Sequence, residues 1–438
     1  MDGGIYVKSY QMIEKGPGIA QGIRDFGKSI SSQTIAAAII ASVFGCTGPI
    51  LVCMRAATDA GFSNAEVVSW VWSVYVFGGL LGIFLSLRYK MPIAGAWSIP
   101  GATMLSSSLQ GFTFAEASGA FLIAGVIVLL LGVTGAIGKV VKYLPIPIVM
   151  GMIGGCMFRF GTGIITNTEA SPILGLAAIG GYFIVPRIIK RCPPALSALI
   201  CGVIALIATN QMGIGEITLE YAGPMLVKPE FNPASILAVS VPLAALVVGA
   251  ENAQAMGVLM GQGYQVPCNA MTVFSGIGGI ITSFFGGANA NIAGPMTAIC
   301  AGEDAGPNLE KRYTSAVLNG VCFTLCGLLM GYILAFVNLI PTALVNVISG
   351  LAMIGVLMGA FQDAFQTGLC RYGAFMALVI GASGITIFSI GSAFWALVGG
   401  VAVSLIVERQ DFTKLIHAKQ GGDEGTDSKA IATELSSD

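Results

Sequence analysis

The sequence has few of the side chains on which most catalytic and metal centres depend. Only one of its 438 residues is a histidine. That residue, His417, lies near the C-terminal end, which excludes histidine-based metal sites and histidine-dependent triads from the rest of the chain. The ten cysteines contain no CxxC pair, so we interpret them as reduced thiols. HExxH, paired-aspartate and Ser/His patterns are also missing. We therefore expect no enzyme, no cofactor and no bound metal.

Charge is equally scarce. Charged residues make up 10% of the chain and the formal net charge is −1, which argues against a nucleic-acid partner. Hydrophobic residues make up 55%, a composition typical of an all-α polytopic protein in a lipid bilayer. The apolar runs between residues 33 and 407 predict fourteen membrane segments. Glycine and proline interrupt the third and the tenth, at residues 92–101 and 286–295.

The positions of the basic residues predict the orientation. An even number of segments puts both termini on one side of the membrane. With fourteen, 18 of the 21 lysines and arginines fall on the side of the termini. Arg55 and Lys228 fall on the other side and Arg159 falls within a span. By the positive-inside rule, we expect cytoplasmic termini in a multi-pass protein of the cell (inner) membrane.

The two ends of the chain are more polar than the middle. Residues 1–30 lack the apolar core of a signal peptide. Apolar residues recur at helical spacing from Ile19 to Ile30, which predicts an amphipathic helix on the cytoplasmic surface. Residues 408–438 are rich in Gly, Ser and Asp, which predicts a disordered cytoplasmic tail.

The chain contains an internal repeat. Pro100 and Pro295 each stand at the start of the short helix of a broken segment, 195 residues apart, and residues 143–149 resemble residues 338–344 at the same offset. Seven segments per half is an odd number, so the second half would enter the membrane from the opposite side. Paired, interrupted segments in an inverted repeat are the best sequence indication of a transporter's central site. Ordinary re-entrant packing is the alternative.

One carboxylate stands near the middle of a span. Glu251 lies in the apolar run 236–260, where a charged group costs about 2.5–3.5 kcal/mol on insertion scales, so it is a functional candidate and the predicted proton carrier. Gln254 lies on the same helix face. The neighbouring residues are Gly and Ala, which leave room for a ligand or for close helix packing. The alternative is a protonated carboxyl group that bonds to another helix without any ligand.

The two short helices would direct unpaired N–H groups and positive dipole ends at a shared pocket in the middle of the bilayer. Arg159 could attract a carboxylate solute or pair with Glu251 as a charge partner; it could equally snorkel outward or bind helix carbonyls. Any of the polar candidates could instead satisfy local backbone. The predicted substrate-binding residues are Glu251, Asn252, Gln254, Trp97, Ser98, Asn289, Asn291, Thr47, Ile99 and Ile292.

Several motifs together resemble one transporter family. They are AWSIPGA at 96–102, SLQG at 108–111, RFG at 159–161, AIC at 298–300 with RY at 312–313, and GSAFW at 391–395. On these motifs the chain is similar to the benzoate:proton symporters over nearly the whole membrane region. The resemblance implies the uracil-permease-like fold of two inverted seven-segment repeats. It also implies a homodimer that works by elevator-like movement.

By the same resemblance, the chain divides into a core and a gate domain. The core would comprise residues 31–137 and 234–337, with segments 1–4 and 8–11. The gate would comprise residues 138–212 and 338–407, with segments 5–7 and 12–14. An extracellular loop, 213–233, would join the halves.

One position departs from the family pattern. Benzoate-type members carry Gln-Asn where this sequence has Glu251-Asn252, and a glutamate there resembles the nucleobase permeases. The first hypothesis is therefore a proton-coupled symporter of a small aromatic carboxylate such as benzoate. The alternative is proton-coupled uptake of a nucleobase-like or other nitrogenous solute recognised by Glu251. An ion channel is a third, less favoured hypothesis.

Overall fold

The computed structural model of the protein describes residues 13–135, 145–189, 193–211, 223–337, 339–385, 387 and 392–411. Helices dominate these ranges, and two strands of two residues each accompany them. Six of the described helices are long and apolar enough to cross a membrane. The predicted all-helical membrane fold is thereby confirmed, whereas the number of fourteen segments stays a prediction. The predicted tail after residue 411 and part of the predicted extracellular loop, 212–222, lie outside the described residues.

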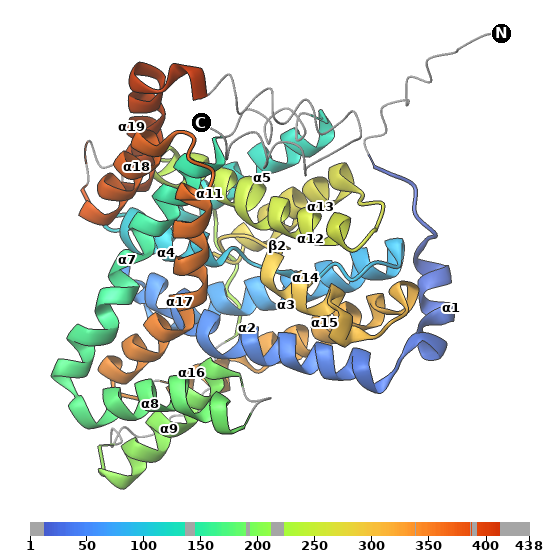
Figure 1. Ribbon diagram of the computed structural model, residues 1–438, viewed down its shortest axis with the longest axis horizontal. Helices are drawn as coiled ribbons and strands as arrows, with labels where there is room; N and C mark the ends of the chain where they lie inside the picture. The colour runs from blue at the N-terminus through green and yellow to red at the C-terminus, as the bar shows by residue number, and fades with distance from the viewer. Residues whose placement is uncertain are drawn as a thin grey trace, which may run out of the picture.

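The first half of the chain forms two short helices and several longer ones (Figure 1). Its elements are α1 (Ile19–Ser29), α2 (Ser32–Asp59), α3 (Asn64–Tyr89), β1 (Gly95–Ala96), α4 (Ile99–Ser108), α5 (Phe114–Val133), α7 (Ile146–Ala170), α8 (Pro172–Ile188) and α9 (Pro194–Ala208).

The second half repeats this order. One long helical span covers α10 (Pro233–Ser235), a π-helical stretch (Ile236–Ser240), α11 (Val241–Leu246), a second π-helical stretch (Val247–Asn252) and α12 (Ala253–Gly261). It is followed by α13 (Cys268–Ser283), β2 (Asn291–Ile292), α14 (Gly294–Ala301), 3-10 turns at Glu303–Ala305 and Leu309–Lys311, α15 (Tyr313–Leu328), α16 (Met330–Val337), α17 (Thr342–Phe365), α18 (Arg371–Ser383) and α19 (Ser392–Val407).

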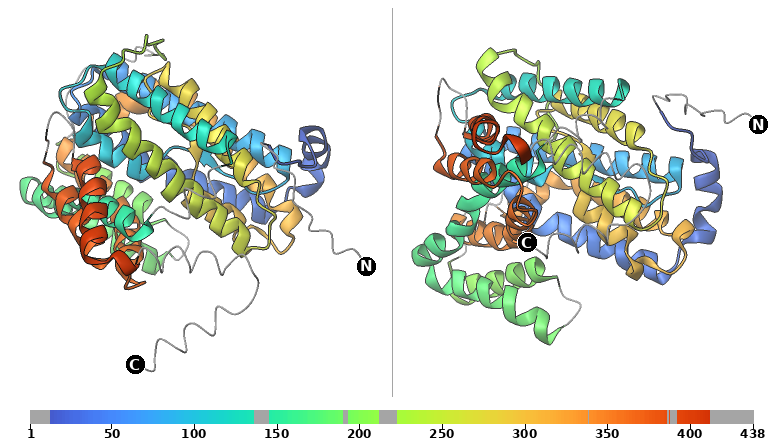
Figure 2. Two further views of the ribbon diagram at one scale, coloured as in Figure 1. Left: turned by 90° about the horizontal axis from the view of Figure 1, so that it is seen from above. Right: turned by 45° about the horizontal axis from the view of Figure 1, so that its top comes forward.

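The helices gather into two groups. In Figure 1 and in both views of Figure 2, α7, α8, α9, α17, α18 and α19 lie together on one side, and α2, α3, α5, α12, α13 and α15 lie on the other. Each group takes helices from both halves of the chain. The short helices α4 and α14 lie within the second group, close to the boundary with the first.

Helix pairing follows the internal repeat. The helix before the strand in each half packs along the helix after the half-helix in the other half: α3 along α15, and α13 along α5. Helices α7 and α17, which occupy the same place in the two halves, also pack along each other. Such an exchange relates the two halves by a two-fold arrangement, which agrees with the inverted repeat expected from the sequence.

Each strand crosses the helix before it at a glycine. A Cβ atom on Gly78 of α3 would lie 2.8 Å from the Ala96 carbonyl oxygen, and one on Gly278 of α13 would lie 2.3 Å from the Ala290 carbonyl oxygen. Any larger residue would therefore push the strand away from the helix. Each half thus uses a glycine to bring its broken segment close to the preceding helix.

Helix α2 is continuous across an internal proline. It runs through Pro49 as one helix from Ser32 to Asp59. A capping box at Ser31, formed with Thr34, begins the helix. Helix α1 forms where the apolar spacing predicted it and lies against the end of α3, where Lys90 Nζ is 3.0 Å from Asp25 Oδ2.

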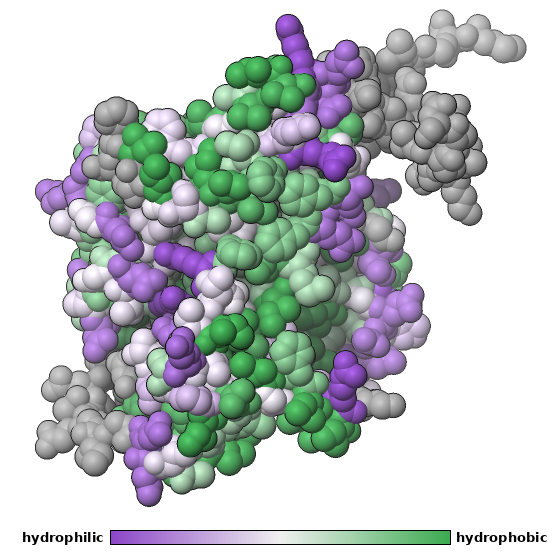
Figure 3. Space-filling view, turned by 60° about the vertical axis from the view of Figure 1, so that its left-hand side comes forward, coloured by the Kyte–Doolittle hydropathy of each residue, from purple (hydrophilic) through white to green (hydrophobic). Residues whose placement is uncertain are grey.

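The outer surface carries many exposed apolar side chains, as a lipid-facing surface requires. Figure 3 shows them covering broad areas of one face, with much of the polar surface toward its margins. On α8, for example, Ile173, Leu176 and Ile184 are each more than half exposed. The large aromatic residues Trp70, Tyr75 and Phe323 are instead fully buried between the helices.

Candidate functional site

The two broken segments meet in the interior of the protein. Strands β1 and β2 pair in antiparallel fashion, with Gly95 opposite Ile292 and Ala96 opposite Asn291. The Ala293 N–H also donates to the Ala94 carbonyl oxygen at 2.9 Å. This pairing satisfies backbone groups that would otherwise be buried without partners. It also brings together the N-terminal ends of α4 and α14, which follow the strands directly.

The two half-helices are capped differently. Ser98 precedes α4, and its hydroxyl oxygen accepts a hydrogen bond from the Gly101 N–H at 3.0 Å. Helix α14 follows Ala293, which has no side-chain hydrogen bond to offer. An N–H group at the start of a buried helix needs a partner from elsewhere in the fold.

Glu251 supplies that partner for both helices. Its Oε1 accepts a hydrogen bond from the Ile99 N–H at 3.2 Å, and its Oε2 accepts one from the Gly294 N–H at 3.1 Å. One carboxylate thus bridges the first turns of two half-helices, where the positive ends of both dipoles favour negative charge. The side chain is only 3% exposed, so Glu251 faces the protein interior.

The backbone around Glu251 is irregular. Residues Val247–Asn252 form a π-helical stretch, and such stretches inside α-helices occur frequently at functional sites. The neighbouring Asn252 is fully buried, and its Oδ1 accepts a hydrogen bond from the Ser275 hydroxyl at 3.2 Å. Asn252 therefore holds this stretch against α13, while Glu251 turns toward the half-helices.

A cavity of about 420 Å³ borders the carboxylate, a size suited to a small organic solute. The charged side chains among its described lining residues are Glu251 and Asp363, both carboxylates. Both groups of helices contribute to its walls. The lining residues are Phe44, Ile99, Pro100, Met150, Ile153, Tyr182, Ala250, Glu251, Gln254, Pro295, Ala352, Gly355, Gly359, Ala360 and Asp363.

The cavity includes three of the residues expected from the sequence: Glu251, Gln254 and Ile99. Ser98 and Asn289 lie outside the cavity but stabilise the site. The Ser98 N–H donates to Asn289 Oδ1 at 3.0 Å, which links the two segments that precede the half-helices.

Other predicted residues lie away from the cavity. Asn291 is fully buried, and its Nδ2 donates to the Ile292 carbonyl oxygen at 3.2 Å. Ile292 is itself fully buried in an apolar cluster. Thr47 belongs to α2, but its side chain lies outside the described part of the chain.

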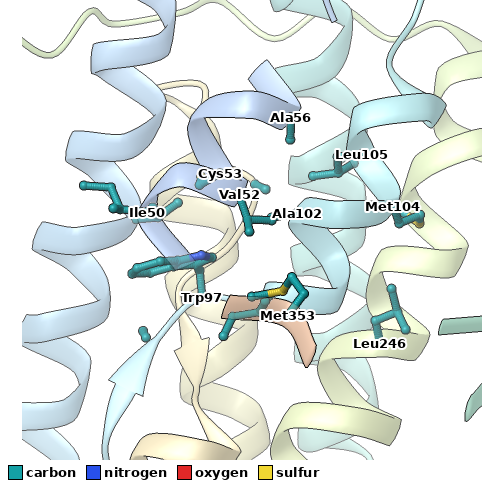
Figure 4. Packing of buried hydrophobic residues seen from close by; sticks show 14 of the residues in the cluster. Ile50, Val52, Cys53, Ala56, Trp97, Ala102, Met104, Leu105, Leu246 and Met353 are labelled. Carbon is teal, nitrogen blue, oxygen red and sulfur yellow. The ribbon is translucent and has the colours of Figure 1, made fainter. Parts of the chain in front are cut away.

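Trp97 also belongs to the core in this conformation. Figure 4 shows it packed among Ile50, Val52 and Cys53 of α2. Its ring centroid lies 4.3 Å from that of Tyr75. The indole therefore contributes to packing behind the half-helices and does not line the cavity wall.

Arg159 does not pair with Glu251 in this conformation. Its guanidinium donates to the hydroxyl of Ser106, at the far end of α4. The sequence allowed pairing with Glu251 because it predicted the depth of both residues in the membrane but not which faces of their helices meet.

Sequence reasoning missed the part of the cavity wall that comes from α7, α8 and α17. Met150, Tyr182 and Asp363 are the clearest cases. Asp363 offered a signal, because an acidic residue lies just beyond an apolar run. Because α17 continues to Phe365, the helix carries Asp363 beyond the end of the apolar run.

The paired half-helices, the inverted repeat and the cavity beside them define a membrane protein of the inverted-repeat transporter class. Residues 28–406 match the family model described as "Benzoate membrane transport protein". The chain belongs to this family. The protein is therefore a multi-pass membrane transporter, and the family resemblance expected from its motifs is confirmed.

Two curated relatives are similar over most of their length. The benzoate membrane transport protein of Acinetobacter baylyi is 29% identical over 377 residues, which cover 86% of this chain and 95% of the relative. The inner membrane protein YdcO of Escherichia coli is 28% identical over 391 residues, which cover 88% of this chain and 99% of the relative.

Solved structures show the same fold at lower identity. The transmembrane domain of the cyanobacterial bicarbonate transporter BicA aligns with a TM-score of 0.57 at 16% identity, over 86% of this chain and 96% of that domain. The murine anion transporter Slc26a9 in its inward-facing state aligns with a TM-score of 0.55 at 15% identity, over 88% of this chain and 70% of Slc26a9.

Proposed function

We propose that the protein is a proton-coupled symporter of a small aromatic carboxylate such as benzoate, with Glu251 as the proton carrier. The observation that carries this proposal is the position of the Glu251 carboxylate, which borders the cavity and accepts hydrogen bonds from the first turns of both half-helices. The names of the family and of the Acinetobacter relative support benzoate as the first candidate.

The geometry suggests how proton and anion would be coupled. An ionised Glu251 occupies the amides of Ile99 and Gly294 with its own negative charge. A second carboxylate brought beside it would be repelled. Once Glu251 takes up a proton, the half-helix ends lose their negative partner and favour the carboxylate of the solute. Proton and solute would therefore bind together, and neither would cross efficiently alone.

The cavity walls suit an aromatic ring. Phe44, Ile153 and Met150 offer apolar surface, and Tyr182 adds an aromatic side chain. Gln254 can orient the solute through its amide group. In this proposal Glu251, Gln254 and Ile99 contact the solute, whereas Ser98, Asn252 and Asn289 position them.

The two groups of helices suggest how access would alternate. The half-helices and Glu251 belong to one group, and α7, α8 and α17 close the cavity from the other. We propose that the first group moves along the second as an elevator, within a homodimer. In the proposed orientation both termini face the cytoplasm of a bacterial cell and the protein lies in the inner membrane.

A second candidate follows from the cavity's charge. Its charged lining residues are the two carboxylates Glu251 and Asp363, which would suit a nitrogenous solute that donates N–H groups to Glu251. Uracil and adenine are suitable probes of this class. The two candidates differ in the sign of the charge that the cavity accepts.

The deciding experiment uses the purified full chain in liposomes that contain a pH-sensitive dye. Benzoate added outside should acidify the interior, and a protonophore should abolish benzoate accumulation. Protein-free liposomes correct for passive entry of benzoic acid. Acidification by uracil or adenine but not by benzoate would favour the second candidate. A current that needs no proton movement would favour a channel and contradict both.

A further inference from the structure

A second polar cluster lies beyond the half-helix α4, away from the cavity. It consists of Arg55 and Asp59 of α2, Ser106 of α4 and Arg159 of α7. Arg55 Nε lies 3.6 Å from Asp59 Oδ2, and the Ser106 hydroxyl donates to the same oxygen at 2.5 Å. Arg159 donates to the Ser106 oxygen. The cluster therefore joins α7, from one group of helices, to α2 and α4 of the other.

The cluster and the cavity occupy opposite halves of the same helices. On α4, Pro100 lines the cavity and Ser106 lies six residues further along, about 9 Å at 1.5 Å per residue. On α7, Ile153 lines the cavity and Arg159 again lies six residues further along. A solute that enters from the side opposite the cavity would meet this cluster before it reaches Glu251.

The cluster holds more positive than negative charge. Two guanidinium groups face a single carboxylate: Arg55 lies beside Asp59 directly, and Arg159 is linked to it through the Ser106 hydroxyl. Among the described residues, Arg55 Nη1 is buried and has no hydrogen-bond partner. Buried donors are normally paired, so this nitrogen is available for a further acceptor. The Asp59 side chain is 31% exposed, so an ion from solution can reach the cluster.

An aromatic ring lies beside both arginines. The Arg55 guanidinium carbon is 4.9 Å from the centre of the Phe160 ring, and that of Arg159 is 5.8 Å from the same centre. Gly163, one turn later on α7, lies beside Arg55, since a Cβ there would be in van der Waals contact with Nη1 at 3.7 Å. Guanidinium groups beside an aromatic ring match the two parts of an aromatic carboxylate.

We propose that Arg55 and Arg159 form a capture site for the carboxylate of an incoming aromatic solute, with Asp59 as the internal carboxylate that occupies the site in this conformation. When the protein opens on this side, the solute carboxylate displaces Asp59 from Arg55 and Ser106 and binds both guanidinium groups, and its ring lies against Phe160. When the solute moves on to Glu251, Asp59 returns and closes the path. This inference rests on the proposed function.

The test compares benzoate transport from the two sides of the membrane. Right-side-out and inside-out membrane vesicles that contain the full chain expose the cluster side and the cavity side in turn. Arg159→Gln should raise the benzoate concentration for half-maximal uptake by about ten-fold from the cluster side and by less than about two-fold from the cavity side, the loss expected for one charge-assisted hydrogen bond. Arg187→Gln, on the exposed end of α8, is the matched control and should change neither value.

Two further variants keep the test decisive if Arg159→Gln fails to fold. Arg159→Lys retains the charge but not the fork of donors, and should give a smaller rise confined to the cluster side. Asp59→Asn removes the internal competitor and should lower the half-saturating benzoate concentration on that side. A purely structural role for the cluster would lower the amount of folded protein without such sidedness.

The outcomes distinguish this inference from the proposed function. Equal changes on both sides, or no change in any variant, would overturn the capture site while leaving benzoate symport intact. Absence of benzoate transport by the wild-type protein from either side would overturn the proposed function and the capture site together.

Discussion

Glu251 and Gly294 are 43 residues apart in the chain, yet Oε2 of the first lies 3.1 Å from the amide nitrogen of the second. Helix α14 has no side-chain cap of its own, so the carboxylate of a different helix takes that place. The same carboxylate borders the cavity. Any change in its charge therefore acts both on the solute site and on the start of a half-helix.

Glu251→Gln should abolish accumulation of solute against a gradient. A glutamine cannot release a proton, and its single oxygen can accept from the Ile99 N–H or the Gly294 N–H but serves both poorly. The unpaired donor should cost about 1–3 kcal/mol of stability. Proton-driven benzoate uptake in liposomes and thermal unfolding in detergent measure the two effects. Glu230→Gln, on an exposed residue, is the control. Undiminished uphill transport in Glu251→Gln would rule out this residue as the proton carrier.

Gly294→Ala should disturb the site through its neighbour Gln254. The new Cβ would lie 2.3 Å from Gln254 Oε1 and 2.8 Å from Gln254 Cβ, so the side chain and its helix must both shift. We expect transport to fall about ten-fold or more, since displacements near 1 Å at a site have effects of that size. Gly257→Ala is the matched control because its Cβ would meet nothing within 4 Å. Equal transport by the two variants would show that Gln254 tolerates the displacement.

Asp363→Asn should change affinity on the cavity side, with a sign that depends on the solute. Asp363 lines the cavity, and its Oδ1 accepts a hydrogen bond from Gln366. Like charges there repel by on the order of 1 kcal/mol, roughly a five-fold change in affinity. Benzoate should bind more tightly to the variant and dissociate more slowly. A cationic solute should bind more weakly. Binding titrations with benzoate and with a cationic solute measure the two changes, and Glu310→Gln serves as an exposed control. Unchanged affinity for both solutes would remove Asp363 from the site.

The ion pair between Asp25 and Lys90 should make stability depend on pH. The hydrogen bond from Lys90 holds the pKa of the Asp25 carboxyl below its ordinary value of 3.8. A lowered pKa in the folded state means that the stabilisation is present at neutral pH and is lost as the pH falls through that lowered value. Asp25→Asn should therefore have a lower Tm than the wild type at pH 7, and the difference should vanish well below pH 3.8. A Tm difference that persists in acid would point to a contact other than the ion pair. The control Asp304→Asn changes an exposed residue and should show no Tm difference from the wild type.

The sequence determined the membrane class, the two broken segments and the choice of Glu251 as a functional candidate. Each of these depends on local chemistry. Long apolar runs must cross the bilayer as helices because the backbone has no other partners there. Pro100 and Pro295, each with a glycine beside it, interrupt those helices wherever the helices pack. A carboxylate within an apolar run is costly in any fold, so Glu251 could be identified as a functional candidate before its neighbours were known.

Only the tertiary structure decided which groups meet. The spacing of Glu251 and Gln254 predicted a shared helix face, but not that the face would meet the amides of Ile99 and Gly294. Depth in the membrane left Arg159 several partners, and the packing of α7 against α4 selected Ser106. The aromatic character of Trp97 suited either a ligand or the core, and its packing against Tyr75 placed it in the core. Helical periodicity determines the direction of a side chain from its own helix axis, whereas a site requires the relative rotation and register of several helices, which arise from contacts between residues far apart in the chain.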